Sequence, residues 1–446
     1  MNSSTGEITE EEAAGASASA SSSSVSDIAD PVQASSSLLT DWQIHRVPQQ
    51  MRRKDQTSYL YDPIMVSYGP YHHGKRHLRQ AEEFKPQVLN LLFLETGRDK
   101  DFFMKMILNW IDHIRNCYVG ISRDVYDNVK LAEMMLADAS LILYLLDVQG
   151  RKSDIESFVL ISHKALGLTG LELIMRDLYV LENQIPYWIV QYLNNFSPRR
   201  VQGPMTSPIV QPLHLLAIDR AVLVGWQKET HVVVQVQSKP KLIWRSRVKG
   251  SIIDGNLEKL SRPFRSVTDL KAKGIRFRPS SKVLKDIRFE SYYFHGQLQL
   301  PSWHITEDFK YKCSNMIAFE LSPGIFFDLG VTSYVNFMKS LIQSPDDVKE
   351  LREKGIFTTT LSNKEVVQMF EEMDTYGLEQ KDDFLEVKMR IEKHCSNKAK
   401  TWMAELLHTY FRSPWTFLAL CAAIVALCLA SLQGYYAIRR ANKSSS

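Results

Sequence analysis

The chain has 446 residues and a formal net charge of +4, with 44% apolar and 23% charged residues. This is the composition of an ordinary folded protein, and the length allows two or three domains or one large domain with tails. The five cysteines form no CxxC pair, which argues against a disulfide framework and a cysteine-based zinc site.

The first segment, residues 1–38, is rich in Ser, Ala and acidic residues. Such a composition has too little apolar surface to offset the entropy lost on ordering, so we expect a disordered tail. The segment lacks the basic start and the apolar stretch of a secretory signal. Its acidic run also argues against an organelle transit peptide.

Helical periodicity dominates the residues that follow the tail. Residues 101–117 place apolar side chains on one helical face. Residues 129–146 are apolar on most sides, which predicts a buried central helix. Residues 171–193 are typical of a helix that is interrupted near Pro186. The three prolines in residues 203–212 indicate a loop.

The β-like patterns are few and lie in the second half of the chain. Residues 231–237 resemble a strand, and residues 283–320 alternate in short runs, namely VLKDIRFES, GQLQLPSWHI and NMIAFEL. The residues after these runs return to helical spacing. The sequence therefore predicts an α+β fold that is mainly helical with a small β element, in one large domain over residues 39–412.

Two regions carry opposite charge. Residues 239–288 hold 15 Lys or Arg against four acids, and residues 346–392 hold 13 acids against seven Lys or Arg. Either the two regions face each other across the fold, or they serve different partners. The basic segment, residues 239–288, contains aromatic residues and suits nucleic acid or anionic lipid, or it is a solvated loop.

The C-terminal region carries no charged residue between Ser413 and Ile438. About 20 apolar residues are enough to cross the hydrocarbon core of a membrane as a helix. Trp415 stands at one end of the stretch and two tyrosines stand at the other, where aromatic belts occur. Residues 413–438 therefore predict a transmembrane helix, followed by a short basic tail at residues 439–446.

This anchor predicts a single-pass membrane protein, which we assign to the plasma membrane. The side on which the large domain lies is not decided by the sequence. Basic residues on the two sides of the span are nearly balanced and lean slightly toward a cytosolic tail. The missing signal peptide favours tail anchoring, with the large domain in the cytosol. An anchored protein makes anionic lipid a better partner for the basic segment than nucleic acid, which we do not expect.

The first candidate site is the stretch SYGPYHHGK, residues 67–75. Adjacent histidines on an extended segment point to opposite sides, so a shared metal ion is disfavoured. The spacing of the glycines and Lys75 resembles a phosphate loop. However, Arg76 replaces the required Ser or Thr, and Pro70 removes an N–H. His72 or His73 could act in acid–base catalysis, although no partner is identifiable. The alternative is a structural Gly-Pro turn.

The second candidate site is DLYVLENQIP, residues 177–186. Glu182, Asn183 and Gln184 are predicted to lie in an otherwise apolar helix, where polar groups need hydrogen-bond partners. A catalytic carboxylate is one interpretation. The other is a structural network, because Pro186 frees a backbone carbonyl that side chains can satisfy.

Several stretches occur together and in a fixed order. They are YDPIMVSYGPYHHGK, MMLADASLI, RDLYVLENQIPYWIV, PLHLL, SVTDLKAKGIRF, GQLQLPSWHITE, NMIAFE, TSYVNFMKSLI, DVKELREKGIF and YFRSPWTFLALCAAIVALCLASLQ. Over residues 42–438 the chain thereby resembles a plant family known as domain of unknown function 247. One departure is Ala139, where the family usually has Gly, and this affects only the local packing at Asp138.

The resemblance implies a plant protein with a largely helical domain and one C-terminal membrane helix. It implies no catalytic residue, cofactor or metal, because none is established for the family. Members are linked to pollen–stigma self-incompatibility in grasses, which suggests recognition. The family signature residues, whose role is not assigned, are Gly69, Pro70, His72, His73, Gly74, Lys75, Glu182, Asn183, Gln184 and Pro186.

We therefore expect a membrane-anchored recognition or signalling protein that acts through protein–protein contact and is not an enzyme. Two alternatives remain open at this stage. One is an enzyme with an unrecognised site near His72, His73 and Glu182. The other is a scaffold that binds anionic lipid through the basic segment.

Overall fold

The computed structural model describes residues 43–52, 58–150, 156–198, 214–225, 264–281, 283–293, 295–323, 329–377, 383–396 and 414–443. The predicted tail at residues 1–38, the proline-rich loop and the strand-like stretch at residues 231–237 lie outside these residues. The same holds for residues 239–263 of the basic segment.

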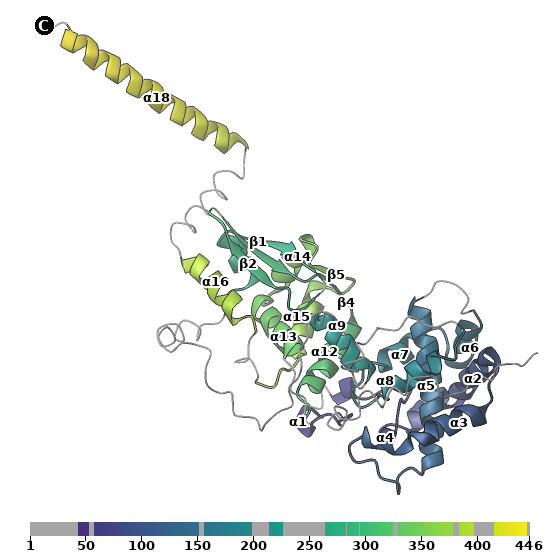
Figure 1. Cartoon of the computed structure of the whole chain (residues 1–446). Coiled ribbons are helices and arrows are strands. Elements are labelled where there is room, and N and C mark those ends of the chain that lie inside the picture. The colour runs from purple at the N-terminus through teal and green to yellow at the C-terminus, as the bar shows by residue number, and fades with distance from the viewer. Residues whose placement is uncertain are drawn as a thin grey trace, which may run out of the picture. The chain divides into compact units, whose positions relative to one another are not determined.

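The described part of the first half of the chain is helical. Its elements are α1 (Gln49–Arg52), η2 (Ser58–Tyr61), η3 (Arg76–Leu78), α2 (Arg79–Thr96), α3 (Lys100–Asn109), α4 (Ile111–Asn116), α5 (Asn128–Gly150), α6 (Glu156–Leu166), α7 (Gly170–Asp177), α8 (Tyr187–Asn194) and α9 (Leu215–Val224). Helix α5 packs against α2, α3 and α8 (Figure 1). Leu131, Met135 and Ala139 on it are fully buried. The prediction of a buried central helix is therefore confirmed.

The second half combines helices with short strands. Its elements are α11 (Val267–Ala272), β1 (Ile275–Pro279), β2 (Arg288–Ser291), β3 (Gly296–Leu300), β4 (Trp303–Ile305), α12 (Glu307–Glu320), α13 (Gly330–Leu341), α14 (Pro345–Glu353), β5 (Phe357–Thr359), α15 (Asn363–Glu372), α16 (Leu385–Ser396) and α18 (Pro414–Lys443). Strands β1, β3 and β2 form one sheet in that order, with β1 parallel and β2 antiparallel to β3. Strands β4 and β5 form a parallel pair. The described chain is thus mainly helical with small sheets, as predicted.

The buried apolar side chains form two large clusters. The first cluster gathers residues from helices α2 to α8. The second gathers residues from the strands and from helices α9 and α11 to α16. The segment between α7 and α8 contributes to both, because Leu181 packs in the second cluster and Ile185 packs in the first. Residues 178–186 therefore lie at the junction of the two cores.

Local capping explains where several helices of the second half begin. Ser266, Ser344 and Ser362 each accept a hydrogen bond from a backbone N–H three residues later, where an acidic side chain bonds back to the serine N–H. This reciprocal capping box satisfies two of the four N–H groups that a helix start leaves unpaired.

Three expectations about element boundaries are wrong. The run NMIAFEL belongs to helix α12 and is not a strand. Residues 315–320 are all buried, so the apolar run carries no period that separates helix from strand. Residues 101–117 divide into α3 and α4 at Trp110. The helix expected over residues 171–193 ends at Asp177, well before Pro186.

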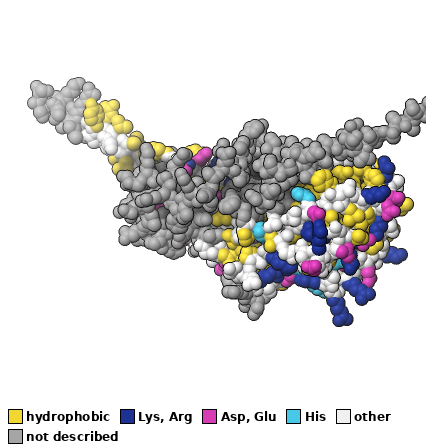
Figure 2. Space-filling view, turned by 60° about the horizontal axis from the view of Figure 1, so that its bottom comes forward, with side chains coloured by type: hydrophobic (Ala, Val, Ile, Leu, Met, Phe, Trp, Pro, Cys, Tyr) yellow, Lys and Arg dark blue, Asp and Glu magenta, His cyan; other side chains and the backbone are white. Residues whose placement is uncertain are grey.

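The two regions of opposite charge face each other where the structure describes them. Lys271 in α11 pairs with Glu350 in α14, and Arg265 Nη2 lies 3.0 Å from Glu392 Oε1. Figure 2 shows that Lys or Arg and Asp or Glu side chains also intermingle on another stretch of the described surface. At these two ion pairs the charges of the basic and acidic regions neutralise each other.

The predicted transmembrane helix is not confirmed. Helix α18 covers Pro414–Lys443, but among the described residues no single helix is long and apolar enough to cross a membrane. Within α18, the uninterrupted stretch whose side chains the structure describes is Cys421–Tyr436, and this stretch is apolar. Two helices that are bent by 96° to each other are long and apolar enough for a membrane span only when they are taken together. They are Ser157–Leu166 and Gly170–Asp177.

Candidate functional site

The SYGPYHHGK stretch forms a turn that packs directly on the second candidate segment. Gly69 has φ +76°, in the left-handed region that favours glycine. A Cβ at this position would lie 2.7 Å from the Gln184 carbonyl oxygen. The Tyr118 hydroxyl also donates to that carbonyl, at 3.1 Å. The two signature motifs are thus in backbone contact, and the contact requires the missing side chain of Gly69.

A buried cluster of charged side chains forms hydrogen bonds with the backbone of the turn. The N–H of Gly69 donates to Asp138 Oδ2 at 2.7 Å, and Lys85 Nζ lies 2.6 Å from Asp138 Oδ1. The same ammonium donates to Glu82 Oε1 and to the Ser67 carbonyl, both at 2.6 Å. Burial works to lower the pKa of Lys85, but the carboxylates of Asp138 and Glu82 outweigh it and raise that pKa. The cluster is therefore an ion pair with its donors satisfied.

The contacts of Gly69 and Lys75 argue against a phosphate loop at this turn. In a phosphate loop, the backbone N–H groups and the lysine must be available to an anion. Here the N–H of Gly69 is bound to a carboxylate, and Lys75 Nζ lies 3.4 Å from Asp62 Oδ1. Both carboxylates would repel a phosphate.

His72 and His73 contact different carboxylates, although they lie in a turn and not on the extended segment that was expected. His72 is 2% exposed. Its Nε2 lies 3.4 Å from Glu182 Oε2 and its Nδ1 lies 3.7 Å from Asp62 Oδ1. His73 is about one-third exposed, and its Nδ1 lies 3.5 Å from Glu82 Oε2. The structure therefore brings His72 and Glu182 together and leaves His73 in a separate contact.

Glu182 connects three parts of the chain. Its Oε1 accepts the N–H of Val47 at 2.7 Å, and its Oε2 lies 3.0 Å from Arg52 Nη2. Burial works to raise the pKa of Glu182, but His72, Arg52 and the Val47 N–H outweigh it and lower that pKa. Burial lowers the pKa of His72 despite the nearby carboxylates. At neutral pH we therefore expect a charged Glu182 and a neutral imidazole.

The side chains of Asn183 and Gln184 form hydrogen bonds with the backbone. The prediction that these residues lie in a helix is wrong. Asn183 Oδ1 accepts the N–H of Tyr68 at 2.7 Å, and its Nδ2 donates to the carbonyls of Val66 and Asp177. Gln184 Nε2 donates to the carbonyls of Leu178 and Val180, both at 2.7 Å. These side chains replace the backbone pairing that a helix would supply. Pro186 stands as the N-cap of α8.

Sequence reasoning missed Asp177, which organises the same region. Its two carboxylate oxygens accept three consecutive N–H groups, those of Ile64, Met65 and Val66, at 2.7–3.0 Å. Burial raises its pKa to about 6, against the lowering effect of these hydrogen bonds. The aspartate stands at the start of the second candidate segment, but nothing in the sequence indicates which N–H groups it reaches.

Asn315 was also missed, and it joins the junction to the second core. Its Oδ1 accepts the N–H of Leu181 at 2.9 Å, and its Nδ2 donates to the carbonyl of Leu60 at 2.8 Å. The hydroxyl of Tyr311 donates to the carbonyl of Asp62 at 3.0 Å. Asn315 opens NMIAFE, one of the stretches that carry the family resemblance, but nothing in the sequence indicates which backbone groups its side chain reaches.

The arrangement can hold a rigid backbone framework, but it offers little access for chemistry. The signature polar groups are mostly bonded to the backbone or to each other. The imidazole of His72, which has the best acid–base geometry, is shielded from solvent. Within the described residues, no group of three or more His, Cys, Asp or Glu side chains could hold a metal ion.

The mainly helical fold and this network of signature residues define the class of protein. The profile of a family described as "Plant protein of unknown function" (DUF247) matches residues 44–429. The match covers most of the chain, so the chain belongs to this plant family. The resemblance inferred from the motifs is confirmed.

Two relatives from Arabidopsis thaliana are similar to this chain. The chain is 26% identical over 440 residues to "UPF0481 protein At3g47200", covering 89% of this chain and 86% of that protein. It is 29% identical over 184 residues to "Putative UPF0481 protein At3g02645", covering 40% of this chain but only 33% of that protein. Neither name states an activity. No solved structure matches the chain.

Proposed function

We propose that this chain is a membrane-anchored recognition or signalling protein that acts through protein–protein contact. The observation that carries the proposal is the internal use of the signature residues. Glu182, Asn183 and Gln184 bind the backbone or buried groups of this chain, so they support a rigid framework better than a reacting site. Such a framework suits a protein that presents surfaces to a partner.

Helix α18 supports the membrane part of the proposal. Leu418, Ile424, Val425, Leu427 and Leu429 on this helix are each more than half exposed. Exposed aliphatic side chains on several sides of one helix need an apolar environment. We propose that α18 lies in a membrane as a single span, and that this membrane is the plasma membrane.

Alkaline carbonate extraction of membranes from plant cells that express the full chain tests the anchor. We expect the chain to stay in the membrane pellet. A variant with Ile424→Arg and Leu427→Arg should move to the supernatant, because a cation at the centre of a span costs roughly 3 kcal/mol. If the unmodified chain is extracted, the anchor is wrong. Tags on both termini, tested by protease protection, then decide the side of the domain.

Proximity labelling tests the proposal that the chain acts through contact with a partner protein. The full chain fused to a labelling enzyme should enrich specific proteins over the same enzyme fused to residues 414–446 alone. The control reaches the same membrane but lacks the framework. If the two fusions label the same proteins to the same extent, the recognition proposal is wrong.

An enzyme remains the second candidate, and one observation favours it. The His72 imidazole lies between two carboxylates, those of Glu182 and Asp62, which is a common acid–base arrangement. Incubation with a plant metabolite extract, followed by mass spectrometry, tests this reading. A metabolite consumed by the native chain but not by an equally folded Glu182→Gln variant would support it. If the native chain changes no metabolite, the enzyme reading is not supported.

A further inference from the structure

One face of the sheet β1-β3-β2 is open to solvent and carries arginines. In β1 the side chains of Ile275 and Phe277 are buried, while those of Arg276 and Arg278 are exposed. The pairing register sets Gln299 between Arg278 and Arg288 across the three strands. We call the solvent side of these strands the exposed sheet face. Its residues are Arg276, Arg278, Arg288, Glu290, Gln297 and Gln299.

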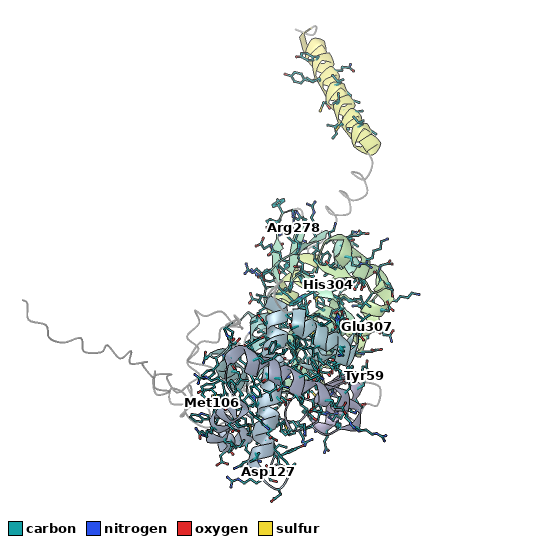
Figure 3. The ribbon with its side chains drawn as sticks, turned by 90° about the vertical axis from the view of Figure 1, so that its right-hand side faces the viewer. Tyr59, Met106, Asp127, Arg278, His304 and Glu307 are labelled. Carbon is teal, nitrogen blue, oxygen red and sulfur yellow. The ribbon has the colours of Figure 1, made fainter. Side chains whose placement is uncertain are left out.

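Two of the arginines on this face have no ion-pair partner in the part of the chain that the structure describes. Arg288 Nε lies 2.8 Å from Asp286 Oδ1, and Glu290 accepts the hydroxyl of Tyr292. No carboxylate pairs with Arg276 or Arg278 in the same way. Figure 3 shows the side chain of Arg278 projecting from the edge of the folded ribbon. The exposed sheet face therefore offers two unneutralised guanidinium groups.

Exposed tyrosines follow directly at the end of β2. Tyr293 is 82% exposed and Tyr292 is 43% exposed. The ring of Tyr292 stacks on His295 with centroids 5.0 Å apart. Tyrosines combine an apolar ring with a polar hydroxyl and are enriched at the boundary between lipid and water. Guanidinium groups bind phosphate oxygens through two parallel hydrogen bonds.

The chain itself ties this face to α18. Helix α16 packs on β2, where His394 contacts Phe289 at a centroid distance of 5.6 Å and bonds Ser291 Oγ at 2.8 Å. Helix α16 ends at Ser396 and α18 begins at Pro414. The residues between them reach at most about 60 Å when fully extended. A membrane that holds α18 is therefore always within reach of the sheet.

We infer that the exposed sheet face binds the anionic phosphate headgroups of the membrane in which α18 is anchored. Arg276 and Arg278 contact the lipid phosphates, and Tyr292 and Tyr293 enter the headgroup layer beside them. This inference rests on the proposed membrane anchor. A tethered surface needs only weak affinity, because the tether keeps its local concentration at the membrane high. Each basic residue near an anionic leaflet strengthens the attraction roughly fivefold.

Hydroxyl-radical footprinting of the full chain in lipid nanodiscs tests the inference. One set of discs contains only phosphatidylcholine, and the other contains phosphatidylcholine with phosphatidylserine. Oxidation of Tyr293 should be slower in the anionic discs, and raised salt should remove the difference, because exposed charges are screened. Tyr59 is 52% exposed and lies apart from Arg278 of the sheet (Figure 3), so it should be oxidised equally in both kinds of disc.

Charge reversal provides the matched comparison. The variant Arg276→Glu with Arg278→Glu should lose the protection of Tyr293. The control variant Lys105→Glu with Lys349→Glu changes the net charge equally, at two exposed positions on α3 and α14. This control should keep the protection of Tyr293. Equal thermal unfolding of both variants shows that each is folded.

The outcomes separate this inference from the anchor. If the chain stays with both kinds of disc after carbonate washing but Tyr293 is never protected, the headgroup inference is wrong and the anchor stands. If the chain is washed from both discs, the anchor itself has failed and the inference fails with it. Protection of Tyr293 by an added RNA oligonucleotide, but not by anionic discs, would assign the face to nucleic acid instead.

Discussion

At the residue scale, two signature side chains and the neighbouring Asp177 act mainly on backbone groups that no regular element satisfies. Asp177, Asn183 and Gln184 together accept or donate hydrogen bonds along residues 64–68 and 177–180. A buried backbone group without a partner costs about 1–3 kcal/mol. These polar residues therefore stabilise two irregular segments that could not otherwise be buried.

Gly69→Ala should destabilise the protein more than Gly74→Ala. Both glycines have positive φ, +76° and +80°, so each alanine carries backbone strain of about 1 kcal/mol. Only at Gly69 does the new Cβ meet the Gln184 carbonyl, at 2.7 Å, whereas nothing lies within 4 Å of it at Gly74. We expect a total loss of roughly 3 kcal/mol for Gly69→Ala. Urea unfolding of both variants measures this, and equal losses would contradict it.

Lys85→Met should remove a large part of the stability. The substitution leaves the fully buried Asp138 without its cation, and breaking a buried pair in this way costs about 3–5 kcal/mol. The control Lys100→Met removes an exposed pair with Glu133 and should cost at most about 1 kcal/mol. Chemical unfolding of the two variants compares them. Similar losses would show that the Lys85 ammonium is not needed to hold Asp138.

At the element scale, sequence patterns located a few helices, such as α5, but not the boundaries of the others that were expected. Helix α5 was predictable because its apolar residues continue over many turns. The end of α7 was not predictable, because residues 171–193 are apolar on both sides of the break. The break at Leu178 depends on partners that lie over 100 residues away in the sequence. The same reason explains why Glu182, Asn183 and Gln184 were wrongly expected in a helix.

One helix start should make stability depend on pH. His214 is the N-cap of α9, and its Nδ1 accepts the N–H of Ala217 at 3.2 Å. Burial lowers the pKa of His214 to about 3, while the unfolded chain keeps a value near 6.5. The unfolded state therefore binds more protons below pH 6.5, so stability is full above this pH and falls as the pH drops. The loss from pH 7.5 to 5.5 should be about 1.4 kcal/mol for this group.

His214→Asn separates this effect from the other titrating groups. Asparagine is a good N-cap and does not titrate. The variant should lose about 1.4 kcal/mol less stability than the native chain between pH 7.5 and 5.5. Urea unfolding at both pH values measures the difference. Identical pH dependence in the two proteins would show that His214 is not the responsible group.

At the scale of the whole molecule, the irregular segment 178–186 joins two hydrophobic cores. It contributes apolar side chains to both cores. Helices of the second core also bond to it: Asn315 Oδ1 of α12 accepts the Leu181 N–H, and the Leu216 N–H of α9 donates to Gln184 Oε1 at 3.2 Å. Figure 1 shows helix α12, which carries Asn315, among the helices of the second half. The signature residues of this segment therefore lie where the two hydrophobic cores of the described chain meet.

Asn315→Leu should loosen this junction. The change leaves the buried N–H of Leu181 and the carbonyl of Leu60 without their partner, which should cost roughly 3 kcal/mol in total. Hydrogen–deuterium exchange should become faster at Leu181. The control Asn363→Leu removes one bond to Arg352 at the surface and should leave that exchange unchanged. An unchanged rate at Leu181 in Asn315→Leu would show that another contact holds the junction.

The sequence by itself determined the family, the mainly helical class and the apolar C-terminal stretch, because these depend on composition, motif order and local period. The tertiary structure alone decided what the signature residues do. Their partners lie far away along the chain: the N–H of Tyr68 donates to Asn183, and the N–H of Val47 donates to Glu182. These hydrogen bonds satisfy backbone groups that become buried only when the two cores pack against residues 178–186. No local sequence pattern indicates which groups will pair.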